Sequence, residues 1–232
     1  MNDYSTNKKY IIIENDGSIK NKVLRNTYLL LSISLIPTVL GAAIGIFSGI
    51  HNTLLAGNGI SSLLFFIGTI FLMFQIEKNK NNSYGVILLL TFTFFMGLML
   101  SRLLGIILGM HNGSQLVMTA FGSTSIIFGT MSILSNKIKS DLSNLHKFLF
   151  SGLLVLFIIS LFNIFLKMSS IMITTSIMST IIFSGFILVD LKRIIENGED
   201  NYISATLTLY LDIYNLFSNL LILIGFMNNR ED

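Results

Sequence analysis

The stretch "LYLDIYNLF", residues 209–217, places an aspartate, Asp212, in the middle of a strongly apolar segment. The segment extends over residues 204–226 and satisfies the ~20 residues that a helix needs to cross the ~30 Å hydrocarbon core of a bilayer. A charged side chain on such a helix is costly if it faces lipid. The position of Asp212 therefore indicates a helix whose polar edge faces protein or water.

Six further apolar blocks precede this one and give the chain the composition of a membrane protein. Of the 232 residues only 12% are charged, where a soluble domain carries about 25%. Only helices and closed barrels satisfy their backbone groups in lipid, and barrel strands would alternate in polarity. These blocks do not alternate, so the sequence predicts an all-α, polytopic membrane protein with seven transmembrane helices, the first six at approximately 28–50, 60–76, 84–108, 115–135, 148–166 and 171–189.

The polar ends of the chain frame this domain. We expect a tail of residues 1–27, a transmembrane domain of residues 28–226 and a short C-terminal tail of residues 227–232. The mixed, polar composition of the first tail is typical of a disordered segment; the alternative is a handle for a cytoplasmic partner. Lysine and arginine concentrate in this tail and in every second loop, so the positive-inside rule predicts a cytoplasmic N-terminus and an external C-terminus.

Several function classes are disfavoured by what the sequence lacks. The absence of cysteine excludes disulfides, thiol catalysis and thiolate metal sites. The lysines are scattered among loops, which does not favour a nucleic-acid partner. No phosphate-binding glycine loop, nucleophile elbow or zinc-binding histidine pair occurs, so we expect no enzyme.

Arg102, near the outer end of its span, is interpreted as reaching the lipid headgroups.

A stripe of polar residues follows one face of the last span. At 100° per residue these side chains align along the helix, and they are candidates to line a pore or cavity: Ser204, Thr208, Asp212, Asn215 and Asn219. Apolar residues cover the other faces, which places the helix near the centre of the bundle.

A second carboxylate, Asp190, ends the sixth span in "SGFILVDLKRII". One interpretation is a solvated interfacial aspartate beside Lys192 and Arg193. Counting depth at ~1.5 Å per residue leaves ~10 Å between Asp190 and Asp212, which a helix shift, a tilt or a water-filled vestibule would have to bridge. If they meet, the two carboxylates share protons, because both cannot ionise cheaply in a low dielectric. Deprotonated, they offer oxygen ligands suited to Ca²⁺, so the pair is a candidate ion-binding site and pH sensor.

Several segments resemble one known family over nearly the whole chain after residue 22. They are "KVLRNTYLLLS" (22–32), "KSDLSNLHKFLFSGLLVLFIISLFNIFL" (139–166), "ILVDLKRII" (187–195) and "NYISATLTLYLDIYNLFSNLLILIGF" (201–226). The sequence is similar to the Bax inhibitor-1 (transmembrane BAX-inhibitor-motif) family, above all to its bacterial YccA-type members. The resemblance implies six helices wrapped around a central seventh, in a bacterial inner membrane.

The resemblance also implies two activities. Some bacterial members are pH-sensitive calcium leaks controlled by a di-aspartyl pair, whose positions match Asp190 and Asp212. YccA-type members restrain the membrane-anchored ATP-dependent protease FtsH through a cytoplasmic tail, whose place residues 1–27 occupy. Leak-type members also use an arginine that pairs with the aspartates. Here "QIEKNKNN" (75–82) offers Lys78 and Lys80 as a possible latch, as point charges rather than a bidentate fork.

Three hypotheses therefore remain, in this order. The first is a proton-gated leak for Ca²⁺ or another cation, and the second is a modulator of an FtsH-type protease; the two are compatible. The third, an intramembrane aspartyl protease, is disfavoured because "ILVD" and "LYLD" lack the Gly-x-Gly-Asp motif. We expect no resident cofactor, and the sequence leaves the oligomeric state open.

Overall fold

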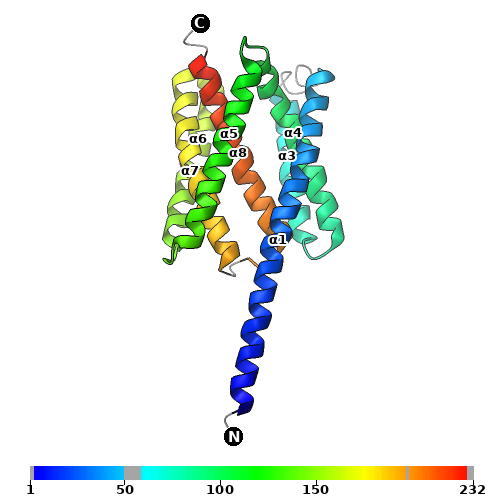
Figure 1. Ribbon diagram of the computed structural model, residues 1–232. Coiled ribbons are helices and arrows are strands. Elements are labelled where there is room, and N and C mark those ends of the chain that lie inside the picture. The colour runs from blue at the N-terminus through cyan, green and yellow to red at the C-terminus, as the bar shows by residue number, and fades with distance from the viewer. Residues whose placement is uncertain (1–2, 50–58, 197–198, 229–232) are drawn as a thin grey trace.

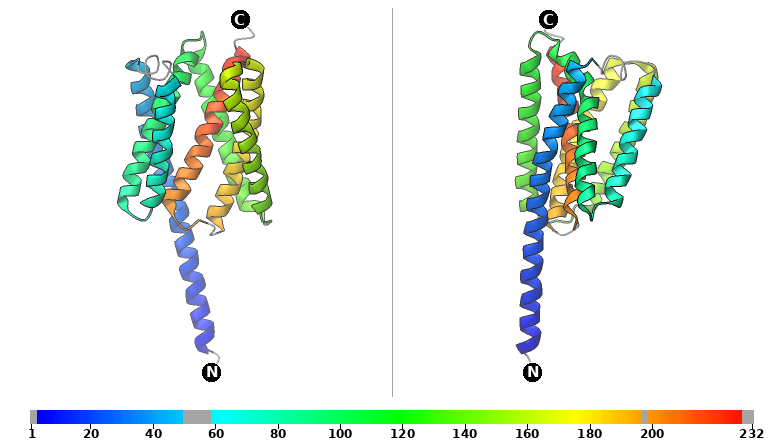
Figure 2. Two further views of the ribbon diagram at one scale, coloured as in Figure 1. Left: turned by 180° about the vertical axis from the view of Figure 1, so that it is seen from behind. Right: turned by 90° about the vertical axis from the view of Figure 1, so that its right-hand side faces the viewer.

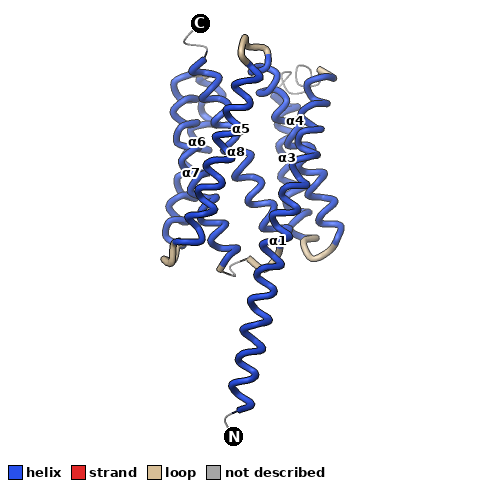
Figure 3. The backbone as a smooth tube through the Cα atoms, viewed as in Figure 1, coloured by secondary structure: helices blue, strands red, loops and turns tan. Residues whose placement is uncertain are grey.

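The computed structural model describes residues 3–49, 59–196 and 199–228, with side chains described from 22–49, 67–196 and 199–228. This part of the chain contains seven helices and no strand (Figures 1 and 3), as the all-α prediction requires: α1 (Asp3–Phe47), α3 (Gly59–Lys78), α4 (Ser83–Leu108), α5 (Gly113–Lys137), α6 (Ser143–Leu166), α7 (Ser169–Ile195) and α8 (Tyr202–Asn228).

Six of these helices are long and apolar enough to cross a membrane, with α1 contributing residues 22–47. The remaining helix, α3, covers the predicted span 60–76. The predicted C-terminal tail begins inside α8, and its residues 229–232 lie outside the described part of the chain.

The N-terminal part of α1 extends far beyond the bundle, at the end opposite the C-terminus (Figures 1 and 2). Residues 3–21 continue this helix, which differs from the predicted disordered tail. Apart from Gly17 this segment lacks strong helix breakers, so it can prolong the helix that the first span starts. The loops that follow α3, α5 and α7 lie at the same end, here called the N-terminal side (Figure 1). Its assignment to the cytoplasm stays a prediction.

Helix α8 runs obliquely between a group formed by α1, α3 and α4 and a group formed by α5, α6 and α7 (Figures 1 and 2). It packs against α7, α5, α1, α4 and α3, whereas among the described residues α6 packs against α7 alone. Met227 is the only exposed residue in the whole of α8. The stricter expectation, that all six other helices wrap around α8, stays a prediction.

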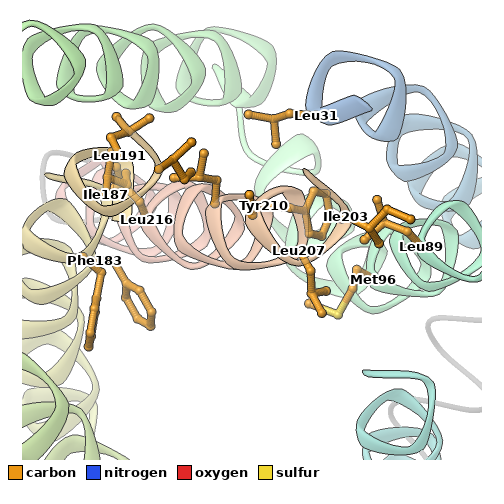
Figure 4. Close-up of a cluster of buried hydrophobic side chains, with 14 of the residues drawn as sticks. Leu31, Leu89, Met96, Phe183, Ile187, Leu191, Ile203, Leu207, Tyr210 and Leu216 are labelled. Carbon is orange, nitrogen blue, oxygen red and sulfur yellow. The ribbon is translucent and has the colours of Figure 1, made fainter. Parts of the chain in front are cut away.

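The apolar faces of α8 fix its rotation within the bundle. Its side chains join a buried cluster to which α1, α4 and α7 also contribute (Figure 4), including Leu31, Leu89, Met96, Ile187, Leu191, Leu207, Tyr210 and Leu216. Two tyrosine hydroxyls add polar anchors. Tyr210 Oη lies 2.8 Å from Thr38 Oγ1, and Tyr214 Oη donates to the carbonyl of Met96 at 3.2 Å. With these faces held against α1 and α4, Asp212 is free to face α7.

Candidate functional site

The structure brings Asp190 and Asp212 together. Both residues are buried, at 5% exposure each, and their carboxyl groups lie close enough to interact directly. Two features of the helices explain why the difference in depth between Asp190 and Asp212 is smaller than the sequence led us to expect. Helix α7 continues to Ile195, so Asp190 lies inside the helix and not at its end. Helix α8 also runs obliquely through the bundle, which shifts the depth of its residues from that of an upright span (Figure 1).

This contact has a direct chemical consequence. Ionised carboxylates only accept hydrogen bonds, so a hydrogen bond between two carboxyl groups requires a proton on one of them. Within the described part of the chain, Oδ2 of Asp212 is buried and has no hydrogen-bond partner. Two buried carboxyl groups this close cannot both ionise cheaply, which favours a proton shared by the pair.

The polar stripe of α8 continues on both sides of Asp212. Toward the N-terminal side, Ser204 is buried and its Oγ has no hydrogen-bond partner among the described residues. Toward the other side, Asn215 donates its amide nitrogen to the carbonyl of Leu211, and Asn219 does the same to Asn215, both at 2.8 Å. The amide nitrogens of these two half-buried residues thus bind the backbone of their own helix.

A small cavity of about 10 Å³, room for about one water molecule, adjoins the carboxyl pair. It is lined by residues of α7, the following loop and the start of α8: Asp190, Arg193, Ile194, Glu199, Ala205 and Thr208. The guanidinium of Arg193 forms an ion pair with Glu199 at this cavity. The charged or titratable groups around Asp190 are Asp212, Arg193, His146 and Glu199.

The two candidate latch residues do not reach the carboxyl pair. Lys80 pairs with Glu77 at 3.1 Å, and Lys78 is exposed on α3. The guanidinium near Asp190 is that of Arg193, which the sequence interpretation named only as a neighbour of a solvated aspartate. Its position three residues after Asp190, on the same helix face, was the signal that could have identified it.

The described part of the chain contains no group of three or more histidine, cysteine, aspartate or glutamate side chains that could hold a metal. Ca²⁺ takes six to eight oxygen ligands, of which two carboxylates supply at most four. Water would have to supply most of the rest at this site.

The fold and this site define a class: helical, multi-pass membrane proteins with a buried carboxyl pair between their last two helices. The chain belongs to the family whose model, described as "Inhibitor of apoptosis-promoting Bax1", matches residues 20–230. It is 37% identical over 211 residues to an uncharacterized membrane protein of Vibrio cholerae, covering 91% of this chain and 92% of the relative. It is also 35% identical over 206 residues to the Escherichia coli K12 protein named "Modulator of FtsH protease YccA" and to the E. coli O6:H1 "Inner membrane protein YccA", covering 89% of this chain and 90% of each relative. The resemblance recognised in the sequence is thereby confirmed.

Proposed function

We propose that this protein is a pH-sensitive leak for Ca²⁺ or a similar cation in a bacterial inner membrane, gated by Asp190 and Asp212. The observation that carries the proposal is the juxtaposition of these two buried carboxyl groups on neighbouring helices. A protonated pair holds α7 and α8 together and presents little charge. Loss of the proton leaves two negative groups in contact, which repel each other and attract a divalent cation.

The polar stripe supports a route for that cation along α8. Oxygen atoms suit Ca²⁺, and the amide oxygens of Asn215 and Asn219 continue the line from Asp212 toward the C-terminal end of the helix. On the other side of the pair, Thr208 lines the small cavity and Ser204 carries an unpartnered hydroxyl. Cation passage then requires the carboxyl pair to separate, which links conduction to its protonation.

The test is Ca²⁺ flux into proteoliposomes as a function of pH. The wild-type protein should conduct above empty liposomes with a pH-dependent rate, and Asp212→Asn, which keeps the shape but cannot ionise, should fall toward the empty-liposome level. The matched control is Asp141→Asn, because Asp141 is an exposed aspartate in the loop before α6, far from the pair in sequence and outside its contacts. Wild-type flux equal to that of empty liposomes would eliminate the leak.

A second function, modulation of an FtsH-type protease, is supported by a different observation. The relative named as a modulator of FtsH matches about nine-tenths of both chains. In this protein α1 extends residues 3–21 beyond the bundle (Figure 2), where a partner can reach this helix without entering the membrane domain. We infer that this extension lies in the cytoplasm and is the handle for the protease.

Co-purification from membranes tests the handle. Deletion of residues 2–21 should abolish association with the FtsH protease and change the turnover of its substrates. Deletion of residues 229–232, at the opposite end of the chain, is the control and should change neither. Unaltered association after the N-terminal deletion would exclude the handle, whatever the outcome of the flux measurement.

A further inference from the structure

Two ion pairs lie side by side at the end of α7, and only one of them borders the carboxyl site. Lys192 pairs with Glu196 and also donates to the carbonyl of Ile138. Arg193 pairs with Glu199, and both of these residues line the small cavity beside Asp190. Neither Lys192 nor Glu196 lines it. The Lys192–Glu196 pair therefore serves as an internal control for the Arg193–Glu199 pair, because the two pairs carry similar charges and only the second lines the cavity.

The two side chains of the Arg193–Glu199 pair differ in how tightly the surrounding residues hold them. The side chain of Glu199 is only 13% exposed and accepts a hydrogen bond from the backbone nitrogen of Asn201 at 3.3 Å. Asn201 is held in turn by the loop after α3, because its amide nitrogen donates to the carbonyl of Lys80 at 2.9 Å. The side chain of Arg193 is 44% exposed. Glu199 is thus the fixed half, and Arg193 reaches across to it from the more exposed side.

We propose that the Arg193–Glu199 ion pair is the gate between the N-terminal side of the membrane and the Asp190–Asp212 carboxyl pair. This inference rests on the proposed leak, for which it names the access-controlling residues. The cavity behind the pair has room for about one water molecule, so a hydrated cation enters only if the pair opens. The positive charge of Arg193 at the entrance opposes cation entry until the side chain moves away.

The absence of cysteine from the sequence permits a direct test of access. A single Thr208→Cys substitution places a thiol in the cavity wall, and its reaction with a small water-soluble maleimide, measured in membrane vesicles, reports whether the cavity is open. Thr208→Cys should react slowly alone and at least about threefold faster when combined with Arg193→Gln or with Glu199→Gln, as expected for loss of a weak ion pair. These two variants change the net charge in opposite directions, so acceleration in both cannot arise from the local field.

Two controls separate a gate from general loosening. Glu196→Gln breaks the neighbouring ion pair and should leave the Thr208→Cys rate unchanged. Thr124→Cys, a buried position on α5, should react slowly in every background. Equal acceleration by Arg193→Gln and Glu196→Gln, or acceleration at Thr124→Cys to match Thr208→Cys, would overturn the proposal. The exchanged pair Arg193→Glu with Glu199→Arg should restore slow labelling.

The labelling rate tests the gate and the Ca²⁺ flux tests the leak, so each proposal can be refuted without the other. Faster labelling in Arg193→Gln, together with wild-type flux no greater than in empty liposomes, supports the gate over the cavity and refutes the leak. If the wild-type flux depends on pH but neither Arg193→Gln nor Glu199→Gln changes the labelling rate of Thr208→Cys, the gate is refuted and the leak is not.

Discussion

Helices α6 and α8 look alike as membrane spans but occupy opposite environments. Both satisfy the length and composition of a crossing helix, and α6 is the more apolar of the two. Yet within the described part of the chain α6 packs against α7 alone and buries only Leu149 and Leu156, whereas α8 contacts five helices. Lipid tails are as apolar as leucine, so apolarity gives a span no reason to leave the lipid. The polar groups of α8 are what require the interior.

The largest expected effect contrasts one leucine from each helix. Leu216→Ala in α8 removes a fully buried side chain and should lower the free energy of unfolding by about 2–5 kcal/mol. Leu161→Ala in α6 should change it by less than about 0.5 kcal/mol, because Leu161 is 50% exposed and lipid can fill the space. Reversible unfolding in mixed micelles measures both. Equal losses would remove the distinction between the two helices.

The polar contacts of the two helices should differ in the same direction. Tyr210→Phe deletes the hydroxyl that lies 2.8 Å from Thr38 Oγ1 in the buried contact between α8 and α1, and should cost about 1 kcal/mol. Ser151→Ala in α6 deletes an exposed hydroxyl that bonds only its own helix backbone, at 2.8 Å from the carbonyl of Lys147. We expect no measurable loss from it in the same unfolding assay. A loss at Ser151 as large as at Tyr210 would contradict this contrast.

Replacing one glycine in each helix by alanine should change the free energy of unfolding in opposite directions. A methyl group at Gly225 of α8 would lie 2.2 Å from Ile107 Cδ1, and one at Gly152 of α6 would lie 3.0 Å from Ile182 Cδ1. Ile182 borders an apolar groove of about 470 Å³ between α6 and α7 and has space to move. Alanine favours a helix by about 0.8–1 kcal/mol over glycine, whereas overpacking costs about 1–3 kcal/mol. Gly225→Ala should therefore destabilise the protein, and Gly152→Ala should leave it unchanged or slightly stabilise it. The reverse order of unfolding free energies would show that α8 is the looser helix.

The sequence predicted the spans well because the bilayer imposes a strict constraint. Each apolar block became helix, since backbone groups in lipid have no other partner. The depth of Asp190 was harder to predict. Helix α7 continues through Lys192 and Arg193 to Ile195, and nothing in apolarity marks where a helix ends once it leaves the lipid. The tilt of α8 is set by packing with its neighbours and has no local signal (Figure 1).

The same limit applies to the cation nearest the carboxyl pair. Lys78 and Lys80 were chosen from a resemblance in the loop after α3, whereas Arg193 was close to Asp190 through helix geometry alone. Its ion-pair partner, Glu199, lies across a loop whose path the sequence does not specify.

The smallest expected effect concerns how the two helices begin, and it depends on pH. Asp141 accepts hydrogen bonds at Oδ1 from the backbone nitrogen of Ser143 at 2.9 Å and from its hydroxyl at 2.6 Å, at the start of α6. These bonds hold the pKa of Asp141 below its ordinary value of 3.8. A lowered pKa means that the stabilisation is fully present above the ordinary value and is lost as the pH falls through the folded-state value.

Helix α8 begins instead with Asn201, whose Oδ1 accepts hydrogen bonds from the backbone nitrogens of Ile203 at 2.9 Å and Ser204 at 3.2 Å. An amide does not titrate in this range. Acidification from about pH 7 to about pH 3 should therefore lower the hydrogen-exchange protection of the Ser143 amide, corrected for intrinsic rates, more than that of Ile203. In Asp141→Asn the protection of Ser143 should no longer depend on pH. An equal loss of protection at Ser143 and Ile203 in the wild-type protein would contradict this prediction. It would mean that acid destabilises the whole bundle, because titration of Asp141 alone affects only the start of α6.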